Sequence, residues 1–490
     1  MALADYFSKD LLAISQVLKK GTNTQLQDAL NKTVVGIAFD DDVETLEGKA
    51  TLDMTVRLLS RLYPKLIFID LSAKRPKLIN ELTKLSQAIN SKIEIVEGNP
   101  DVVVAIGRTP VTSSVTSGPI FYIGSDEWNV KFSSWKPVGS GSSLVPFGAG
   151  ISGCIGASNV FRYVFKDFLP DVEFDEEFSL SLITLQTVSV EESPSIKSVV
   201  LDDFTLIGFG AVGNGAVWAL ANSPFIEGKL TLVEPETLAL TNLQRYILAE
   251  ESYIEKPKID IARDYVKTPS LKLNLFSGDW VGYLNSEKIW LNKFVLVAVD
   301  NAKDRIGIQS SLPKELINSY TENNLIGISR HFDFGNEACL ICTYMPNEER
   351  KSHSQEVAEN LGLPQPQMER FIRDYLYYNK PADEQLLKMV AAANSIDYSD
   401  LKEFEGIPVP EFYSKVVCGG ALMELRKGES TISVEAPLAF QSAMAGILLI
   451  SELVVRKGKL RKEELPVKTD FYPLLPIRNE INPYIYSFSL

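Results

Sequence analysis

Cysteine is scarce in this chain of 490 residues, which contains only Cys154, Cys339, Cys342 and Cys418. Four cysteines at this length exclude a disulfide-stapled scaffold and suit a reducing compartment, so we expect a cytoplasmic protein. The N-terminus lacks the basic start and the long apolar run of a signal peptide. No apolar run approaches the roughly 18 residues of a membrane helix, so we expect a soluble protein with no membrane partner.

Basic charge is also in short supply. The chain has 49 Lys and Arg against 63 Asp and Glu, a net charge of −14. This balance argues against nucleic acid as a partner, because a phosphate backbone requires a basic face. The only histidines, His331 and His353, suggest no role. What the chain does have is a hydrophobic content of 45%, enough for a substantial core.

One stretch carries a nucleotide-binding pattern. Residues 206–213 read Leu-Ile-Gly-Phe-Gly-Ala-Val-Gly, which predicts a strand, a turn at Gly208, Gly210 and Gly213, and a following helix. Such glycines allow close approach of phosphate, and a helix N-terminus offers unpaired N–H groups to an anion. A second predicted strand ends at Glu234, where an acid can bond ribose hydroxyls. The turn alone fits NAD, FAD and several other nucleotides.

Further motifs follow this turn in register. They are Glu234, then Asn242-Leu243-Gln244-Arg245, then Pro257-Lys258, and finally Val299-Asp300-Asn301 with Arg305. In order and spacing they resemble the signature of the ThiF/MoeB and ubiquitin-activating enzyme family. The resemblance covers residues 200–345 and, more loosely, a helix near 440–455. It implies ATP and Mg²⁺ as cofactors and adenylation of a carboxylate as the reaction.

The resemblance also implies roles for the charged residues. A carboxylate nucleophile is already an anion, so the barrier is its repulsion by the triphosphate. The family pattern places Arg245 and Asn242 on phosphate and Lys258 near the α-phosphate. The alternative is that the two basic residues belong to a solvated basic stretch. The family also takes an arginine finger from a neighbouring half or subunit, and no residue of this sequence is assigned to it.

An acid follows the apolar run 294–299. Asp300 would lie at the carboxyl end of a strand, where open α/β sheets bind ligands. The resemblance places it on Mg²⁺, which prefers one or two carboxylates together with phosphate oxygens. Asn301 and Arg305 are weaker nucleotide-binding candidates. The alternative for Arg305 is that it pairs only with neighbouring residues. The alternative for Asp300 is a helix N-cap, which does not exclude the first role.

Cys418 is the candidate nucleophile. It lies between a charged insertion and the final small-residue helix, where the family carries its thioester cysteine. The neighbouring Gly419 and Gly420 would give mobility, and Lys415 would favour the thiolate. The alternative is a small buried hydrophobe. Cys342 is the second candidate nucleophile.

The pair Cys339 and Cys342 resembles half of the zinc site of ThiF/MoeB enzymes. The other CxxC is absent, and four ligands would require Cys418 and His353. Because a closed zinc site needs four ligands, we expect no zinc. Cys154 lies in an apolar helical pattern and is expected in the core.

The predicted fold is α/β, with two Rossmann-like ThiF-type adenylation halves and a helical insertion. Apolar runs that alternate with helical patterns predict a buried parallel sheet in the first half; these runs are residues 34–39, 66–70, 93–96, 102–107 and 120–124. Asp40, Asp41 and Asp42 follow the first run and would repel phosphate. Each half ends in a small-residue helix entered through a proline, at Pro146 and Pro437. These features indicate an internal repeat in which only the second half binds nucleotide; an unrelated α/β domain is the alternative.

The domain boundaries follow from composition. Residues 170–200 are acidic and polar and mark the division between the halves, and residues 1–33 have a helical pattern. The predicted parts are an inactive adenylation-like domain at 1–190, an active ATP-binding domain at 191–346, a helical insertion forming the catalytic-cysteine region at 347–415, and a crossover segment, final helix and C-terminal strands at 416–490.

The function implied by the resemblance is activation of a ubiquitin-like protein. The enzyme would adenylate the C-terminal glycine of that protein, form a thioester with Cys418 and hand the acyl group to a conjugating enzyme. Similar enzymes occur in bacterial ubiquitin-like conjugation operons, some of them antiphage. The alternative is ThiF/MoeB-like adenylation of a sulfur carrier or peptide without a thioester. A nicotinamide oxidoreductase leaves Arg245 and Lys258 without a task, a non-catalytic scaffold is at odds with the intact Asp300 and Lys258, and a homodimer is left open.

Overall fold

The computed structural model describes most of the chain. The described residues are Tyr6, Ile14, Leu18, 23–169, 173–188, 193–287, 294–322, 324–334, 336–344, 352–413, Val416 and 437–477. They divide into two compact units. The larger comprises Met1–Tyr6, Asp28–Tyr344 and Pro437–Leu490, and the smaller comprises Phe7–Gln27 and Met345–Ala436.

The first half of the larger unit contains an eight-stranded sheet in the order β3-β2-β1-β4-β5-β6-β7-β8. Its strands are β1 (Val35–Phe39), β2 (Lys65–Asp70), β3 (Glu94–Ile95), β4 (Val102–Ile106), β5 (Ile120–Asp126), β6 (Asn129–Ser133), β7 (Glu177–Ser181) and β8 (Gln186–Thr187). The helices of this half are η1 (Asp41–Glu44), α3 (Leu46–Leu62), α4 (Pro76–Ile89), α5 (Phe147–Val164) and η2 (Lys166–Phe168). Helix α2 (Asn23–Lys32) belongs to this unit from Asp28 onward. The strands from β3 to β5 are parallel, and those from β5 to β8 are antiparallel.

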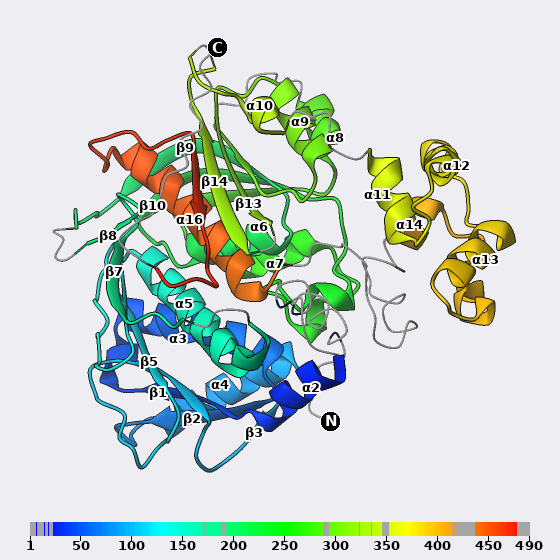
Figure 1. Cartoon of the computed structure of the whole chain (residues 1–490). Coiled ribbons are helices and arrows are strands. Elements are labelled where there is room, and N and C mark those ends of the chain that lie inside the picture. The colour runs from blue at the N-terminus through cyan, green and yellow to red at the C-terminus, as the bar shows by residue number, and fades with distance from the viewer. Residues whose placement is uncertain are drawn as a thin grey trace. The chain divides into compact units, whose positions relative to one another are not determined.

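The second half contains a seven-stranded sheet in the order β11-β10-β9-β12-β13-β14-β15. Its strands are β9 (Val199–Ile207), β10 (Ile226–Val233), β11 (Leu271–Phe276), β12 (Phe294–Val297), β13 (Glu315–Glu322), β14 (Leu325–His331) and β15 (Lys468–Phe471). Its helices are α6 (Ala211–Ala221), η3 (Leu240–Asn242), η4 (Glu251–Tyr253), α7 (Lys258–Tyr265), α8 (Trp280–Glu287), α9 (Ala302–Ser310), α10 (Leu340–Tyr344) and α16 (Ala439–Gly458). Both sheets and the helices that cover them are visible in Figure 1.

The two sheets repeat one topology. Seven strands of the first sheet correspond in order and direction to the seven of the second, with five parallel strands followed by two antiparallel ones. The predicted fold class, two Rossmann-like ThiF-type halves, is therefore confirmed. The antiparallel strands β6, β7 and β8 were not predicted, because their short segments do not alternate with helices. Two of them, β7 and β8, lie in the acidic stretch at 170–200, and the predicted boundary at 190/191 falls outside the described residues.

The smaller unit is helical. Its described helices are α11 (His353–Asn360), α12 (Pro366–Tyr377), α13 (Glu384–Ala393), η5 (Tyr398–Phe404) and α14 (Val409–Tyr413). They enclose a hydrophobic core of their own that includes Leu361, Ile372 and Leu386. Helical patterning was expected over 347–415, and the described part of that range is helical. Most of the helix expected over residues 1–33 lies outside the described residues, apart from α2.

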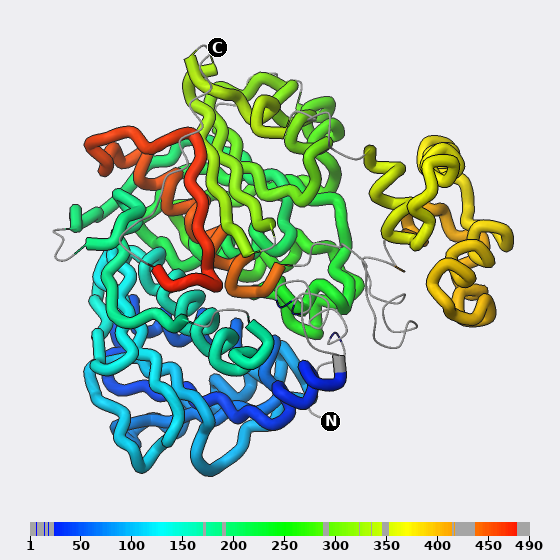
Figure 2. Tube along the Cα trace, viewed as in Figure 1, coloured from blue at the N-terminus to red at the C-terminus, as the bar shows by residue number. Residues whose placement is uncertain are grey.

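Three helices pack between the two sheets. Helix α16 contacts both α5 and α6, and all three can be followed in Figures 1 and 2. Where α16 crosses α6, a Cβ at Gly446 would overlap the carbonyl oxygen of Val212, and one at Gly215 would lie 2.6 Å from that of Ala443. These glycines therefore allow the two helix backbones to touch. By length and mean hydropathy (1.4) α16 resembles a membrane span, but 89% of its apolar window is buried inside the protein, as in a core helix.

We predict that a side chain at this crossing is strongly destabilising. Gly446→Ala would press its Cβ against the α6 backbone, which cannot move as a flexible side chain can. We expect a loss of about 3 kcal/mol in the free energy of unfolding, measured by urea denaturation. The matched control is Gly307→Ala in α9, where a Cβ meets nothing within 4 Å. There the loss of glycine entropy in a helix should stabilise by about 1 kcal/mol. Equal midpoints for the two variants would contradict the close crossing.

Candidate active site

The glycine turn lies between β9 and α6, as predicted. Gly208 has φ +91°, and a Cβ there would lie 2.7 Å from the carbonyl oxygen of Ala298, so only glycine fits without strain. Gly210 is the N-cap of α6, and Gly213 lies in the first turn of the helix, against the backbone of Gly208. The first N–H groups of α6 therefore lie at the carboxyl edge of the sheet, in an orientation that suits an anion.

Glu234 follows β10 and holds this turn. Its carboxylate is buried, with an exposure of 5%, and accepts the N–H of Phe209 at 2.6 Å and that of Glu236 at 2.9 Å. Burial raises the pKa of Glu234, and the nearby Lys258 ammonium and the two N–H groups only partly offset it. A carboxylate has about four lone-pair positions, so two remain for ribose hydroxyls, the role predicted for Glu234.

Lys258 is the first residue of α7, and its side chain is more deeply buried than that of its partner Glu236. Its side chain is 3% exposed and pairs with the Glu236 carboxylate, which is 67% exposed. Its Nζ also lies 3.1 Å from the hydroxyl of Tyr246. Burial lowers the pKa of Lys258, but the electrostatic interactions with Tyr246, Glu234 and Glu236 outweigh burial and raise the pKa overall. The ammonium is therefore charged at neutral pH.

Arg245 and Asn242 lie in the turn that contains η3. The Asn242 side-chain oxygen accepts the N–H of Ala239 at 3.0 Å and so holds this turn. Asn242 therefore has a structural contact in addition to the phosphate contact predicted for it. Arg245 is half-buried, and its Nη1 makes one long bond of 3.4 Å to Gln244. No carboxylate in the described part of the chain pairs with Arg245, which leaves its positive charge available to an anion.

Asp300 is exposed at the end of β12. The N-cap of α9 is Asn301, whose side chain accepts the N–H of Asp304 at 2.8 Å, so the alternative role of Asp300 as the N-cap is wrong. Asn301 also donates to Asp300 at 3.3 Å. Arg305 is buried, donates to the Val299 carbonyl at 2.6 Å and lies over the Tyr344 ring, which is the local pairing considered for it.

The sheet brings these residues to one edge. β9 is flanked by β10 and β12, and Ile207 is aligned with Val233 on one side and with Val297 on the other. The residues that follow these three strand ends are the glycine turn, Glu234 and the segment leading to Asp300. Lys258 joins the group through Tyr246, whose hydroxyl lies 3.5 Å from the position of a Cβ at Gly210. The structure thus places the predicted phosphate-binding groups around one loop; their roles stay predictions.

Sequence reasoning missed Tyr246 and Glu236, the two residues that contact the Lys258 ammonium. Tyr246 follows directly after the Asn-Leu-Gln-Arg motif and Glu236 lies two residues after Glu234. Their proximity to Lys258 comes from the fold, since the backbone N–H of Lys258 bonds the Glu236 carbonyl at 3.0 Å. The nearest signal in the sequence is that a second acid, Glu236, lies close to Glu234.

The corresponding edge of the first sheet is filled by carboxylates. Asp40 follows β1 and accepts the N–H groups of Asp42, Arg108 and Thr109, the last two at 2.7 Å. Asp42 pairs with Arg108 at 3.1 Å and accepts the N–H of Ser140 at 2.7 Å. The backbone donors at this edge are thereby occupied by the chain's own acids, where the second half has glycines.

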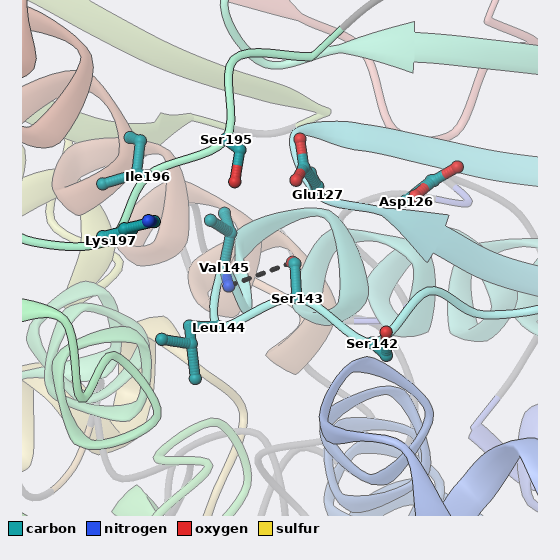
Figure 3. Close-up of a pocket in the computed structure, with 9 residues that line it drawn as sticks. All are labelled: Asp126, Glu127, Ser142, Ser143, Leu144, Val145, Ser195, Ile196 and Lys197. Carbon is teal, nitrogen blue, oxygen red and sulfur yellow. Dashed lines mark hydrogen bonds between the residues drawn. The ribbon is translucent and has the colours of Figure 1, made fainter.

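A cavity of about 380 Å³ lies elsewhere, between residues 126–145 of the first half and residues 195–197, which precede β9. Figure 3 shows Asp126 and Glu127 on one side of it and Lys197 on the other, with the loop of Ser143 and Val145 between them. Glu127 has φ +54°, and burial, with Asp126 and Glu47, raises its pKa. None of the predicted site residues lines this cavity.

The cysteines differ in accessibility. Cys418 lies outside the described residues. Cys154 is buried in α5, with an exposure of 1%, and burial raises the pKa of its thiol. Cys342 is exposed and its Sγ lies 3.6 Å from that of Cys339. Burial and the Cys339 thiol raise the pKa of Cys342, which disfavours the thiolate. His331 is enclosed, and burial lowers its pKa to about 4, so its ring is neutral at pH 7.

Two family models match the chain. The ThiF family model matches residues 182–466, and the model of Prokaryotic E2 family C matches residues 38–166. The uncharacterized protein y4jF of Sinorhizobium fredii (strain NBRC 101917 / NGR234) is 38% identical over 459 residues, which cover 93% of this chain and 87% of that protein. The tRNA threonylcarbamoyladenosine dehydratase of Haemophilus influenzae is 31% identical over 121 residues, which cover 24% of this chain and 45% of the dehydratase.

Solved structures of MccB from E. coli share low similarity with this chain. MccB alone matches with a TM-score of 0.34 and 14% identity, over 56% of this chain and 60% of MccB. MccB with MccA-N7isoASN matches with a TM-score of 0.33 and 13% identity, over 57% of this chain and 62% of MccB.

We predict that iodoacetamide distinguishes two of the cysteines in the folded protein. Cys342 should be alkylated well before Cys154, because only the former is accessible to the reagent. Mass spectrometry of tryptic peptides after timed labelling measures both rates, and labelling in urea, where both thiols are exposed, is the control. Native labelling of Cys154 at the rate of Cys342 would contradict the burial of α5.

Proposed function

Since the chain belongs to the ThiF family and is an adenylation-type enzyme, we propose that it activates a ubiquitin-like protein with ATP. The observation that carries the proposal is the group of cations and N–H donors around the glycine turn of the second half. The C-terminal glycine carboxylate of the modifier would attack the α-phosphorus of ATP, and pyrophosphate would leave. A cysteine thiolate would then attack the acyl adenylate, forming a thioester and releasing AMP.

Lys258 and Arg245 would supply the positive charge for the first step. The Glu236 carboxylate is exposed while the Lys258 ammonium is not, so an entering phosphate would replace Glu236 as the partner of the ammonium. Arg245, with no carboxylate partner among the described residues, would bind a second phosphate. These groups are fixed before the reaction and stabilise charge as it moves to the leaving group. Glu234 would hold both the loop and the ribose.

Asp300 fits the binding of Mg²⁺ together with ATP. Its carboxylate is exposed, and among the described residues no group of three acids, histidines or cysteines could hold a metal without further ligands. One carboxylate plus phosphate oxygens and water is the usual arrangement for this ion. When bound, the ion would neutralise charge on the triphosphate; Asp300 would fix its position, with Asn301 orienting the carboxylate.

The first half would not bind nucleotide. Its carboxylates Asp40 and Asp42 already occupy the N–H groups that a phosphate would need, and added phosphate would meet like charge. We therefore propose an inactive adenylation-like domain at 1–190, an active one at 191–346, the catalytic-cysteine region at 347–415, and the remainder of the active domain at 416–490.

We propose Cys418 as the acyl acceptor. The region that matches Prokaryotic E2 family C, residues 38–166, contains only Cys154, which is buried, so this region offers no accessible thiol. Cys342 is accessible but its raised pKa disfavours the thiolate that the reaction requires. The acyl group would then pass from Cys418 to a separate conjugating enzyme. If the gene for that enzyme lies beside this one in a bacterial operon, the pair would belong to an antiphage conjugation system.

Two variants separate the chemical steps. Cys418→Ala should retain ATP–pyrophosphate exchange with the modifier but lose a reductant-sensitive covalent adduct, because adenylation needs no thiol. Lys258→Ala should lose both, because no adenylate forms. Exchange is followed with labelled pyrophosphate and the adduct by non-reducing electrophoresis, against candidate small proteins that end in glycine. Cys342→Ala is the matched control.

The outcomes discriminate among the hypotheses. An adduct that persists in Cys418→Ala and disappears in Cys342→Ala assigns the nucleophile to Cys342. Exchange without an adduct in the wild type favours adenylation of a sulfur carrier or peptide. Wild-type protein that binds ATP but exchanges no pyrophosphate with any glycine-ending protein would refute activation of a ubiquitin-like protein.

Removal of the Asp300 carboxylate should abolish adenylation. In Asp300→Ala we expect exchange to fall on the order of a thousandfold, because the contact of the carboxylate with the metal is lost in the transition state. The exposed position of Asp300 predicts little change in the unfolding midpoint. The matched control is Glu287→Ala, which removes an exposed acid at the end of α8. Near-normal exchange in Asp300→Ala would remove this residue from the mechanism.

A further inference from the structure

One face of α3 in the first half binds the second half. Asp53, Arg57 and Arg61 are spaced by four residues and therefore share one row of the helix. Each makes a hydrogen bond across the boundary between the halves. We name these three residues the α3 row.

The first contact of the α3 row joins Asp53 to helix α6. Asp53 accepts the indole N–H of Trp218 at 2.8 Å and pairs with Arg57 at 3.0 Å. Trp218 is 1% exposed and lies in the helix that begins at the glycine turn. The position of α6, and with it the N–H groups that face the nucleotide, thus depends in part on a carboxylate of the first half.

The other contacts, made by Arg57 and Arg61, are with residues 246–249, the segment that follows Arg245. Arg61 donates from Nη2 to the carbonyl oxygens of Tyr246 at 2.6 Å and Ala249 at 2.7 Å, and Arg57 donates to that of Ile247 at 3.3 Å. The side chain of Tyr246 meets the Lys258 ammonium at 3.1 Å. A continuous path of contacts therefore leads from Arg61 through Tyr246 to Lys258.

The surroundings of Arg61 argue against a role in stability alone. The side chain is 1% exposed, and within the described residues its Nε and Nη1 have no hydrogen-bond partner. Neither of its hydrogen-bond partners carries a charge, and burial lowers its pKa to about 10. A buried cation without a hydrogen-bonded counter-charge carries a desolvation cost that offsets much of what its hydrogen bonds contribute to stability.

We propose that Arg61 is a positioning residue, through which the first half fixes Tyr246 and, through it, Lys258 for the nucleotide. This inference rests on the proposed nucleotide site but not on the identity of the modifier. The first half, with its own edge filled by carboxylates, thereby contributes to the site of the second without touching the ligand. Small displacements of binding groups have large effects on such sites, so the contribution is measurable.

The test is binding of ATP with Mg²⁺, measured by calorimetry without any modifier. Arg61→Met should raise the Kd on the order of tenfold. Arg61→Lys, which keeps a cationic donor for the two carbonyls, should recover part of the loss. The matched control is Arg162→Met in α5, since Arg162 is equally buried and pairs with Asp175 within the first half. It should lower the unfolding midpoint at least as much, because it leaves a buried carboxylate unpaired, yet keep the Kd within about twofold.

A double-mutant cycle tests the path itself. If Arg61 acts through the tyrosine, Arg61→Met should add little to the effect of Tyr246→Phe, whereas independent roles would give multiplied effects. An unchanged Kd in Arg61→Met, or a Kd that rises equally in Arg162→Met, overturns the inference. Wild-type protein that binds no ATP overturns both this inference and the proposed function. Wild-type protein that binds ATP without exchange overturns only the proposed activation reaction, and the comparison of Kd values still decides the role of Arg61.

Discussion

The backbone contact between α6 and α16 is the constraint on which the arrangement of the second half depends. Gly215 and Gly446 let the two helices approach until main-chain atoms touch, and the Ser319 hydroxyl on β13 adds a bond of 2.9 Å to the Ala445 carbonyl of α16. α6 begins at the glycine turn, whereas α16 is reached only after the chain has passed through the smaller unit. The helix that begins at the glycine turn is therefore held by a segment more than 200 residues later in the sequence, so the second half is complete only when the chain returns at Pro437.

The two halves combine one topology with opposite electrostatics. In both, the carboxyl ends of three neighbouring parallel strands meet at one edge of the sheet, where backbone N–H groups are unpaired by the sheet itself. In the second half these groups lie at a glycine turn, beside the Tyr246 hydroxyl that the Lys258 ammonium contacts. In the first, Asp40 and Asp42 accept them. A buried N–H group needs an acceptor, so where no anion binds the chain must supply one of its own. Asp40 and Asp42 meet that requirement in the first half.

The sequence predicted those parts of the site whose positions follow from strand ends and local spacing. Gly208, Glu234 and Asp300 each come directly after an apolar run, and the carboxyl ends of parallel strands share an edge. It did not predict the antiparallel strands β6 to β8, because their burial pattern is set by neighbours distant in the chain. Nor did it predict that Glu236 and Tyr246 enclose Lys258, or that the α3 row faces the second half. A row of Asp53, Arg57 and Arg61 on one helix is typical of a solvated face, and only the packing of two halves turns it inward.

The burial of Lys258 makes its ammonium depend on the protein groups that contact it. The ammonium is charged and buried, so it needs a counter-charge in the absence of nucleotide, and Glu236 supplies one from the solvent side. In the proposed site the exposed Glu236 carboxylate would give way to phosphate, whereas the buried Tyr246 hydroxyl would stay in contact with Nζ. Electrostatic preorganisation requires that this second contact be rigid. The backbone carbonyl of Tyr246 accepts a hydrogen bond from Arg61, and α3, which carries Arg61, packs on α5 within the first half. The first half thus contributes, through Arg61, a contact to the segment of the second half that holds Lys258.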